Sequence, residues 1–152
     1  MEIDPSQLPS AHAIAYLESR IRTIVDFPQE GIRFKDITTL IGEARAFHIC
    51  LDLLAEPFIG QEVHYVAAME ARGFIFGGAL AARLNTGFVP VRKPGKLPSE
   101  VDEVSYELEY GDNVLQMHRG AIEAGAKVLI VDDLLATGGT AVATADLVHR
   151  QN

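Results

Sequence analysis

One stretch of the chain limits its fold more than any other. Val128 to Thr140 reads VLIVDDLLATGGT, so an apolar run ends in two adjacent carboxylates and then a glycine-rich turn. The residues that follow, Thr140 to Arg150, carry apolar side chains at helical spacing. A buried strand followed directly by a helix is the unit from which parallel sheets are built. We therefore expect an α/β fold in which Asp132 and Asp133 lie at the carboxyl end of a strand.

The rest of the chain alternates between apolar runs and helical patterns. Further strands are predicted at Val63–Met69 and Gly87–Lys93, with a helix between them that reads GFIFGGALAARL. Alternating polar and apolar residues at Val104–Tyr110 and Val114–His118 are typical of an antiparallel pair. The remaining predictions are a turn at Gly111–Asn113, a helix through Ile14, Leu17, Ile21 and Ile24, a helix through Phe47, Leu51 and Leu54, and an irregular loop over Lys93–Glu103. Together these elements predict a mostly parallel sheet with helices on both faces.

Composition narrows the class of protein. With 152 residues, 48% of them hydrophobic and 22% charged, the chain reads as one globular domain. A net charge of −8 argues against a general nucleic-acid-binding surface or a polybasic membrane anchor. No apolar run reaches membrane-spanning length, and the start of the chain lacks the pattern of a signal peptide. The single cysteine, Cys50, fits a reducing cytoplasm, and the histidines show no metal-ligand spacing.

The residues after the acid pair have the chemistry of a phosphate site. Gly138 and Gly139 allow tight turns, so that consecutive N–H groups and the start of the next helix can face one anion. Thr137 and Thr140 add hydroxyl donors. Neither GxxxxGK[ST] nor GxGxxG is present, which argues against the common mononucleotide and dinucleotide loops. A phosphate loop beside two acids suggests a sugar phosphate, although an ordinary strand-to-helix turn with exposed acids is the alternative.

Several motifs carry a specific resemblance. VLIVDDLLATGGT resembles the phosphoribosyl-pyrophosphate signature of the type I phosphoribosyltransferase family. The segments DFPQEGIRFKDIT, EARGFIFG, VRKPGKLP and YELEYG resemble the adenine-specific members of that family, in the same order. The resemblance runs from about Ile14 to the end of the chain. It implies a single domain, residues 1–152, with a small N-terminal hood and base-binding segment at 1–36 and a mobile catalytic loop at 93–103.

The resemblance also implies an activity. Members of this family transfer the ribosyl phosphate of phosphoribosyl pyrophosphate to adenine, giving AMP and pyrophosphate in purine salvage. They depend on Mg²⁺, which is held through the substrate and not directly by protein side chains. The expected partners are these small molecules and a second copy of the chain in a cytoplasmic homodimer, with no nucleic acid and no membrane.

The resemblance assigns roles to individual residues. Arg72, Glu109, Asp132 and Asp133 are the expected catalytic residues, with Glu109 near N7 of the purine. Phosphoribosyl pyrophosphate is expected to contact Ala71, Arg72, Gly73, Arg92, Lys93, Lys96, Tyr110, Asp132, Asp133, Ala136, Thr137, Gly138, Gly139 and Thr140. Adenine is expected at Arg33, Phe34 and Lys35. In the family, the EARG loop often contains a cis peptide bond.

Other interpretations remain open from the residues alone. Glu109 fits the solvent side of a strand, the basic cluster at 92–96 fits a solvated loop, and Phe34 fits a core position. A hypoxanthine-guanine or xanthine enzyme, a regulator that binds phosphoribosyl pyrophosphate without chemistry, and a plain nucleotide-binding module are the alternative functions. In the family the chain continues beyond the helix that ends here at HRQN, so we expect a chain that lacks the usual C-terminal strands.

Overall fold

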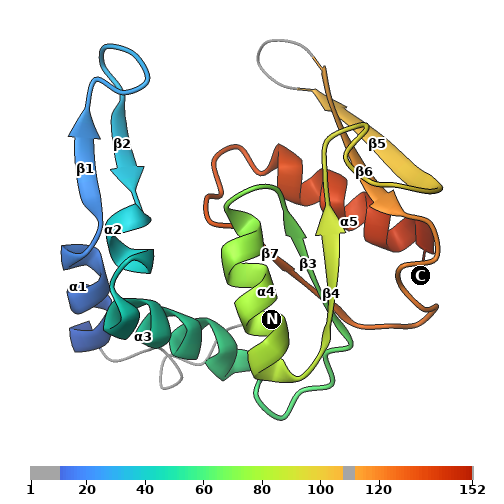
Figure 1. Cartoon of the computed structure of the whole chain (residues 1–152), viewed down its shortest axis with the longest axis horizontal. Helices are drawn as coiled ribbons and strands as arrows, with labels where there is room; N and C mark the ends of the chain where they lie inside the picture. The colour runs from blue at the N-terminus through green and yellow to red at the C-terminus, as the bar shows by residue number, and fades with distance from the viewer. Residues whose placement is uncertain (1–10, 108–111, 152) are drawn as a thin grey trace. The chain divides into compact units, whose positions relative to one another are not determined.

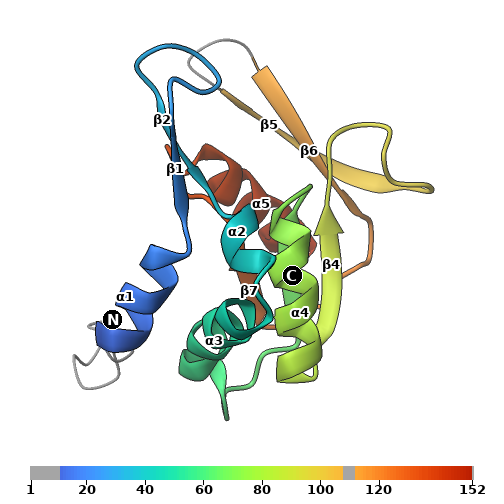
Figure 2. The same cartoon turned by 60° about the vertical axis from the view of Figure 1, so that its left-hand side comes forward.

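The computed structural model describes residues 11–107 and 112–151. The chain divides into two compact units, Met1–Pro57 and Phe58–Asn152 (Figures 1 and 2). The predicted hood, residues 1–36, falls inside the first unit, which extends further along the chain. Within the described residues, no helix is both long enough and apolar enough to cross a bilayer.

The first unit combines a short hairpin with helices. Its elements are α1 (Ala11–Ser19), β1 (Arg22–Val25), β2 (Arg33–Asp36), α2 (Thr38–Ile41) and α3 (Ala44–Ala55), and a 3₁₀ turn at Glu56–Phe58 follows. The predicted helix at Phe47, Leu51 and Leu54 is confirmed as α3. Its residues Ala46, Leu51 and Ala55 are buried.

The prediction that the first helix continues through Ile21 and Ile24 is wrong. Helix α1 ends at Ser19, and Ile24 lies in β1, where it pairs with Phe34 of β2. Residues 21–25 read IRTIV, and β-branched side chains favour an extended backbone when a partner strand is available. The apolar spacing of this segment fits a helix as well, so the partner strand decides its structure.

The second unit is built on a parallel sheet. Strands β4 (Gly87–Val91), β3 (Tyr65–Met69) and β7 (Val128–Val131) lie in the order β4-β3-β7, so β3 is central. Helix α4 (Gly73–Leu84) follows β3, and helix α5 (Gly139–Gln151) follows β7. These strand-to-helix units confirm the predicted α/β arrangement.

The two helices cover opposite faces of this sheet (Figures 1 and 2). Successive side chains of a strand point to opposite faces, and β3 is buried on both. Ala68 of β3 faces α4 at close range. A Cβ added to Gly77 of α4 would lie 2.5 Å from the Cβ of Ala68. Ala67 and Met69 belong to the other layer, a core cluster that includes Ala143, Leu147 and Val148 of α5. The sheet is therefore a rigid frame packed from both sides.

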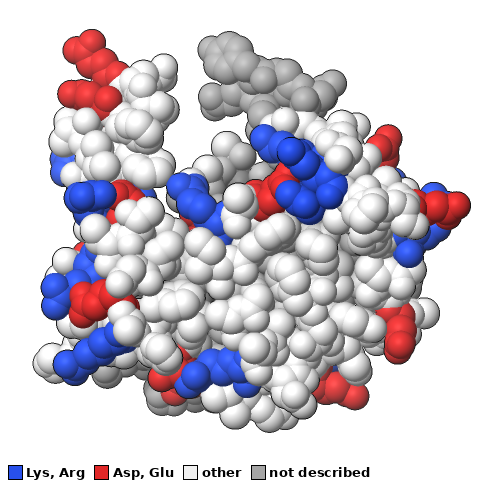
Figure 3. Space-filling model, viewed as in Figure 1, with Lys and Arg blue, Asp and Glu red and all other residues white. Residues whose placement is uncertain are grey.

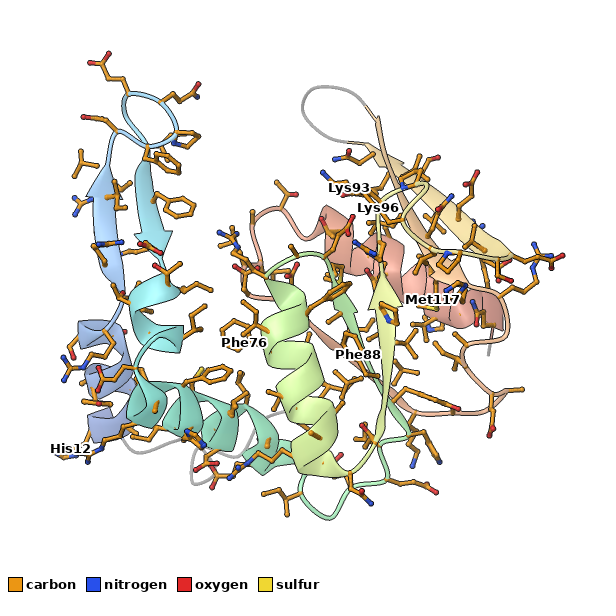
Figure 4. All side chains as sticks on the ribbon, in the orientation of Figure 1. His12, Phe76, Phe88, Lys93, Lys96 and Met117 are labelled. Atoms are coloured by element: carbon orange, nitrogen blue, oxygen red, sulfur yellow. The ribbon has the colours of Figure 1, made fainter. Side chains whose placement is uncertain are left out.

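An antiparallel hairpin completes the second unit, as predicted. Strand β5 (Val101–Glu107) pairs with β6 (Asp112–His118), and a bridge between Arg92 and Gln116 joins the hairpin to the end of β4. Met117 of β6, labelled in Figure 4, is fully buried in the core. Two predicted boundaries are wrong. Residues 101–103 are strand and not loop, because Val101 pairs with His118, and β6 begins inside the predicted turn, at Asp112.

A buried carboxylate ties the hairpin of the first unit to α2. Asp36 is 7% exposed and accepts hydrogen bonds from the Thr38 hydroxyl (2.6 Å) and the Thr38 N–H (2.9 Å). The guanidinium of Arg22, from the partner strand, donates to the same carboxylate. The hydrogen bonds from Thr38, followed by those from Arg22, lower the pKa of Asp36 to about 2.

We predict that Asp36→Asn lowers the thermal midpoint at neutral pH. The folded-state pKa lies below the unfolded value of 3.8, so the stabilisation is complete above that value and is lost as the pH falls towards about 2. The gap between wild type and variant should therefore shrink as the solution is acidified. Thermal midpoints measured from pH 7 to pH 3 test this. Equal midpoints at pH 7, or a gap that does not change with pH, would contradict it.

Candidate active site

A pocket of about 460 Å³ opens at the carboxyl ends of β3 and β7 in the second unit. Its walls come from the loop after β3, the β5–β6 hairpin, the residue Lys93 beyond β4, and the loop between β7 and α5. The lining residues are Met69, Glu70, Ala71, Arg72, Lys93, Tyr106, Asn113, Leu115, Asp132, Asp133, Leu134, Leu135, Ala136, Thr137, Gly138, Thr140 and Ala141. The acid pair and the glycine-rich loop thus line a cavity at the sheet edge where ligands of parallel sheets bind.

Each of the two acids has a partner of its own in the pocket. Asp133 Oδ2 lies 2.8 Å from Arg72 Nε, and the Asp133 side chain is only 9% exposed. Asp132 Oδ1 accepts a hydrogen bond from the Asp133 N–H at 2.9 Å. One acid therefore has a cationic partner from the neighbouring loop, while the other is held by the backbone.

The environment of the pocket raises the pKa of the Asp132 carboxyl. Desolvation in the pocket is the largest cause, and the adjacent Asp133 carboxylate adds to it. The hydrogen bond from the Asp133 N–H and the charge of Arg72 oppose these effects, and the balance raises the pKa of Asp132 to about 6. A carboxylate with that pKa is a good hydrogen-bond partner for hydroxyl groups and gains from any cation that enters the pocket.

Two glycines shape the backbone beside the acid pair. One leaves room for the Asp132 carboxylate, and the other turns the chain into α5. A Cβ on Gly73, the first residue of α4, would lie 2.9 Å from Asp132 Oδ1, so a side chain there would displace the carboxylate. Gly138 has φ +85°, a left-handed conformation that side chains disfavour. It turns the chain into α5, where the Val142 N–H donates to the Gly138 carbonyl at 3.0 Å. The N–H groups of the first helical turn are left without helical acceptors and favour an anion.

Tyr106 is a lining residue that the sequence analysis did not single out. The Thr140 hydroxyl donates to the Tyr106 hydroxyl at 3.3 Å, and a Cβ on Gly139 would lie 3.3 Å from the Tyr106 ring. The side chain thus supports the glycine-rich loop from β5. Its only signal in the sequence is its place in an alternating strand, because its partner lies 34 residues further along the chain.

Glu70, the first residue of the EARG loop, was given no role of its own from the sequence, and it joins the loops after β3 and β4. Its Oε1 accepts from the Lys93 N–H at 2.9 Å and its Oε2 from Arg92 Nε at 2.7 Å. Desolvation acts to raise the pKa of Glu70, but the hydrogen bonds from Lys93 and Arg92 outweigh it and lower that pKa. The Glu70–Ala71 peptide bond is cis, as the resemblance implies for this loop.

The predicted basic cluster is divided by this arrangement. Lys93 lines the pocket, whereas Arg92 and Lys96 are not among the lining residues. Arg92 donates to Glu70 and, through Nη1, to the Lys96 carbonyl at 3.1 Å. Lys93 and Lys96 lie together at the end of β4 (Figure 4), and Figure 3 shows Lys and Arg side chains grouped with acids over this end of the unit.

The remaining predicted residues are placed as follows. Ala71, Arg72, Asp132, Asp133, Ala136, Thr137, Gly138 and Thr140 line the pocket, while Gly73 and Gly139 begin the helices beside it. Glu109 and Tyr110 lie outside the described residues. Arg33, Phe34 and Lys35 belong to β2 in the first unit. There the Phe34 ring packs edge-on against Phe27, with ring centroids 5.2 Å apart, and Lys35 Nζ donates to the Thr23 hydroxyl at 2.9 Å.

The raised pKa of Asp132 predicts that Asp132→Asn stabilises the fold at alkaline pH. The folded state holds the proton up to about pH 6 and the unfolded state only up to 3.8, so wild-type stability falls across that window. The amide carries no charge and avoids the loss. Because solvent screens the pocket, we expect a gain of about 1 kcal/mol, which is roughly 2–4 °C in the midpoint for a chain of this size. Thermal midpoints at pH 8 and pH 4 test this. A variant that melts below wild type at pH 8 would refute it.

Known proteins that are similar to this chain provide independent evidence for its family. Residues 41–152 match the model of the phosphoribosyl transferase domain family. A relative from Sorangium cellulosum named adenine phosphoribosyltransferase is 62% identical over 144 residues, which are 95% of this chain and 72% of that protein. A relative of the same name from Cereibacter sphaeroides is 59% identical over 130 residues, which are 86% of this chain and 73% of that protein.

Solved structures agree with these relatives. The crystal structure of adenine phosphoribosyltransferase from Rhodothermus marinus superposes with a TM-score of 0.87 at 51% identity, covering 93% of this chain and 81% of that chain. The Saccharomyces cerevisiae enzyme, complexed with an imino-altritol bisphosphate and adenine, also gives a TM-score of 0.87, at 40% identity, covering 93% of this chain and 82% of that chain.

Proposed function

The chain belongs to the phosphoribosyl transferase domain family and has its type I fold, and we propose that it converts adenine and phosphoribosyl pyrophosphate into AMP and pyrophosphate. The names of its relatives support adenine as the acceptor. One observation carries the proposal. The pocket brings a glycine-rich helix start and an acid pair together with Arg72 and Lys93. These are the groups that a phosphate, a ribose and a pyrophosphate require.

Each part of the substrate has a matching part of the pocket. The loop at 136–140 supplies N–H groups and hydroxyls for the 5′-phosphate at the start of α5. Asp132 and Asp133 accept hydrogen bonds from the ribose hydroxyls. The loop at 71–73 and the cation of Lys93 take the pyrophosphate. The ribose hydroxyls thereby provide hydrogen-bond donors for the carboxylate oxygens of Asp132 and Asp133, which line the pocket.

The charges that develop during the reaction lie next to pocket residues of opposite charge. As N9 of adenine attacks C1 of the ribose, the N9–C1 bond forms, the C1–O bond breaks and pyrophosphate leaves with the electron pair. The base gives up the proton of its imidazole ring, which ends on the released pyrophosphate or in water. Positive charge grows on the sugar ring next to the acid pair, and negative charge grows on the leaving group next to Arg72 and Lys93. Fixed charges that are already in place stabilise such a transition state without reorganisation. Glu109, outside the described residues, stays the predicted partner of the base.

The donor set fits a magnesium ion that is carried by the substrate. Mg²⁺ prefers oxygen ligands, keeps several waters and is usually held by substrate phosphates. Within residues 11–107 and 112–151, no group of three possible metal-ligating side chains is found. Pyrophosphate and ribose oxygens of a substrate bound beside Asp132 and Asp133 would supply ligands of this kind. When bound, the ion would offset the charge of the leaving group.

Four further predictions of the resemblance also belong to this proposal. Phe34, with the backbone of Arg33 and Lys35, is the proposed adenine-binding segment. The loop after β4 is the proposed mobile catalytic loop. The chain is also proposed to form a homodimer and to be located in the cytoplasm.

We predict that the purified chain transfers ribosyl phosphate to radiolabelled adenine and that excess chelator abolishes the transfer. Hypoxanthine, guanine and xanthine should react at least about a hundredfold more slowly, because a site that hydrogen-bonds one base leaves unpaired groups with another. If transfer to any of these bases is faster than transfer to adenine, that base and not adenine is the substrate. Binding of phosphoribosyl pyrophosphate without transfer to any base would indicate a regulator instead.

We predict that the double variant Asp132→Asn, Asp133→Asn lowers kcat by at least about a hundredfold, because it removes two charges that act on the transition state. The amides keep the shape of the acids, so the variant should remain folded. Asp102→Asn is a matched control, since Asp102 pairs with Arg119 at 3.1 Å and does not line the pocket. Wild-type turnover by a folded double variant would contradict the assigned role.

A further inference from the structure

Glu70 ties two neighbouring loops of the pocket together. Its backbone N–H donates to the Val91 carbonyl at 3.0 Å, so the ends of β3 and β4 are bonded at this point. Beyond that bond, its carboxylate accepts from the Lys93 N–H and from Arg92 Nε. The side chain is only 13% exposed, which keeps these bonds away from competing water. A single residue thus fixes where both chains enter the pocket.

The two chains that Glu70 joins carry the cations of the pocket. Arg72 follows it by two residues, and Lys93 begins the loop beyond β4. Both side chains line the pocket, and Arg72 is paired with Asp133 at 2.8 Å. Because Glu70 is bonded to the Lys93 N–H and precedes Arg72 by two residues, it limits how far the two chains can move apart.

Arg92 is occupied with holding this arrangement. Its Nε donates to Glu70, its Nη1 donates to the Lys96 carbonyl, and its guanidinium lies 5.9 Å from the centre of the Phe74 ring. The loop after Lys93 is fixed further by the Gly95 N–H, which donates to Gln116 Oε1 at 3.2 Å. Arg92 bridges Glu70 to the loop, whereas Lys93 lines the pocket.

We propose that Glu70 is a positioning residue that sets the spacing of Arg72 and Lys93 around the pyrophosphate, and that Arg92 acts through Glu70. This inference rests on the proposed function, because it takes pyrophosphate as the ligand between the two cations. It divides the basic cluster by role. Lys93 meets the leaving group, and Arg92 shapes the loop that presents it.

Binding of inorganic pyrophosphate with Mg²⁺, measured by calorimetry, is the direct test. Glu70→Gln keeps an acceptor for the Lys93 N–H but turns an amide donor towards Arg92, so we expect about tenfold weaker binding, typical of one lost charge-assisted bond. In turnover assays, KM for phosphoribosyl pyrophosphate should rise by a similar factor while KM for adenine stays within about twofold. A general loss of structure would not produce that split.

Glu62→Gln is the matched control. Glu62 is also an acid of the second unit in an ion pair, with Lys127 Nζ at 3.1 Å, and it does not line the pocket. Its replacement should leave pyrophosphate affinity unchanged. Weakening by this control equal to that of Glu70→Gln would show an effect of net charge and overturn the proposal.

A second variant separates positioning by Arg92 from direct contact. Arg92→Lys keeps the positive charge but cannot reach Glu70 and the Lys96 carbonyl together through a rigid fork. If Arg92 acts through Glu70, Arg92→Lys weakens pyrophosphate binding as Glu70→Gln does, and the double variant is no weaker than either single one. Wild-type binding by either single variant, or additive effects in the double variant, would overturn the proposal.

The outcome also separates this inference from the proposed function. Wild-type chain that binds pyrophosphate but transfers nothing to adenine would refute the function, while the binding comparison would still decide the role of Glu70. Wild-type chain that does not bind pyrophosphate would refute both. Normal adenine transfer together with unchanged pyrophosphate binding in Glu70→Gln would refute the positioning role alone.

Discussion

The ion pair between Arg72 and Asp133 is the contact on which the site depends. Strands β3 and β7 are parallel neighbours in register from Tyr65 opposite Val128 to Ala68 opposite Val131, so their carboxyl ends stop at the same level. The loop after β3 and the acids after β7 must then share one space. The pair gives Asp133 a cationic partner and leaves Asp132 with its raised pKa. Without that partner, the repulsion from Asp133 that already helps to raise the pKa of Asp132 would be stronger.

Close packing beneath the site makes this contact possible. Helix α4 starts at Gly73 against Asp132 and approaches the sheet again at Gly77, where there is no room for a Cβ. On the opposite face, Leu147 of α5 is fully buried, which fixes the helix whose start forms the glycine-rich loop. Packing of this density permits little movement. The loops therefore project from a frame that holds their first residues in place, and such precision is what a preorganised site needs.

The sequence predicts the frame better than it predicts the contacts of the site. Apolar runs that end at Met69 and Val131 mark strands, and the helices after them follow from spacing. The expectation that both strands are buried holds for the central β3 and is wrong for β7, which is half-buried because it is the last strand of the described sheet. Strand β1 was missed because a partner strand overrides its helical spacing. The acid pair and the glycine-rich loop are contiguous and could be read as a motif. The contacts of Glu70 and Tyr106 could not be predicted, because the partner residues lie 22 and 34 positions away along the chain and a one-dimensional pattern does not show which distant residues meet.

The charge of the whole chain bears on how the pocket meets a polyanion. With a net charge of −8, the long-range field does not steer anions towards the molecule. Among the described residues that line the pocket, the cations are Arg72 and Lys93, and Arg72 is already paired with an acid. Under the proposed function, a pyrophosphate group whose charge is partly offset by a divalent cation would be repelled less by the acidic chain than a bare one. Groups that are held in place, such as Arg72 beside Asp133 and the N–H groups at the start of α5, would then contribute more to binding than the field of the whole chain.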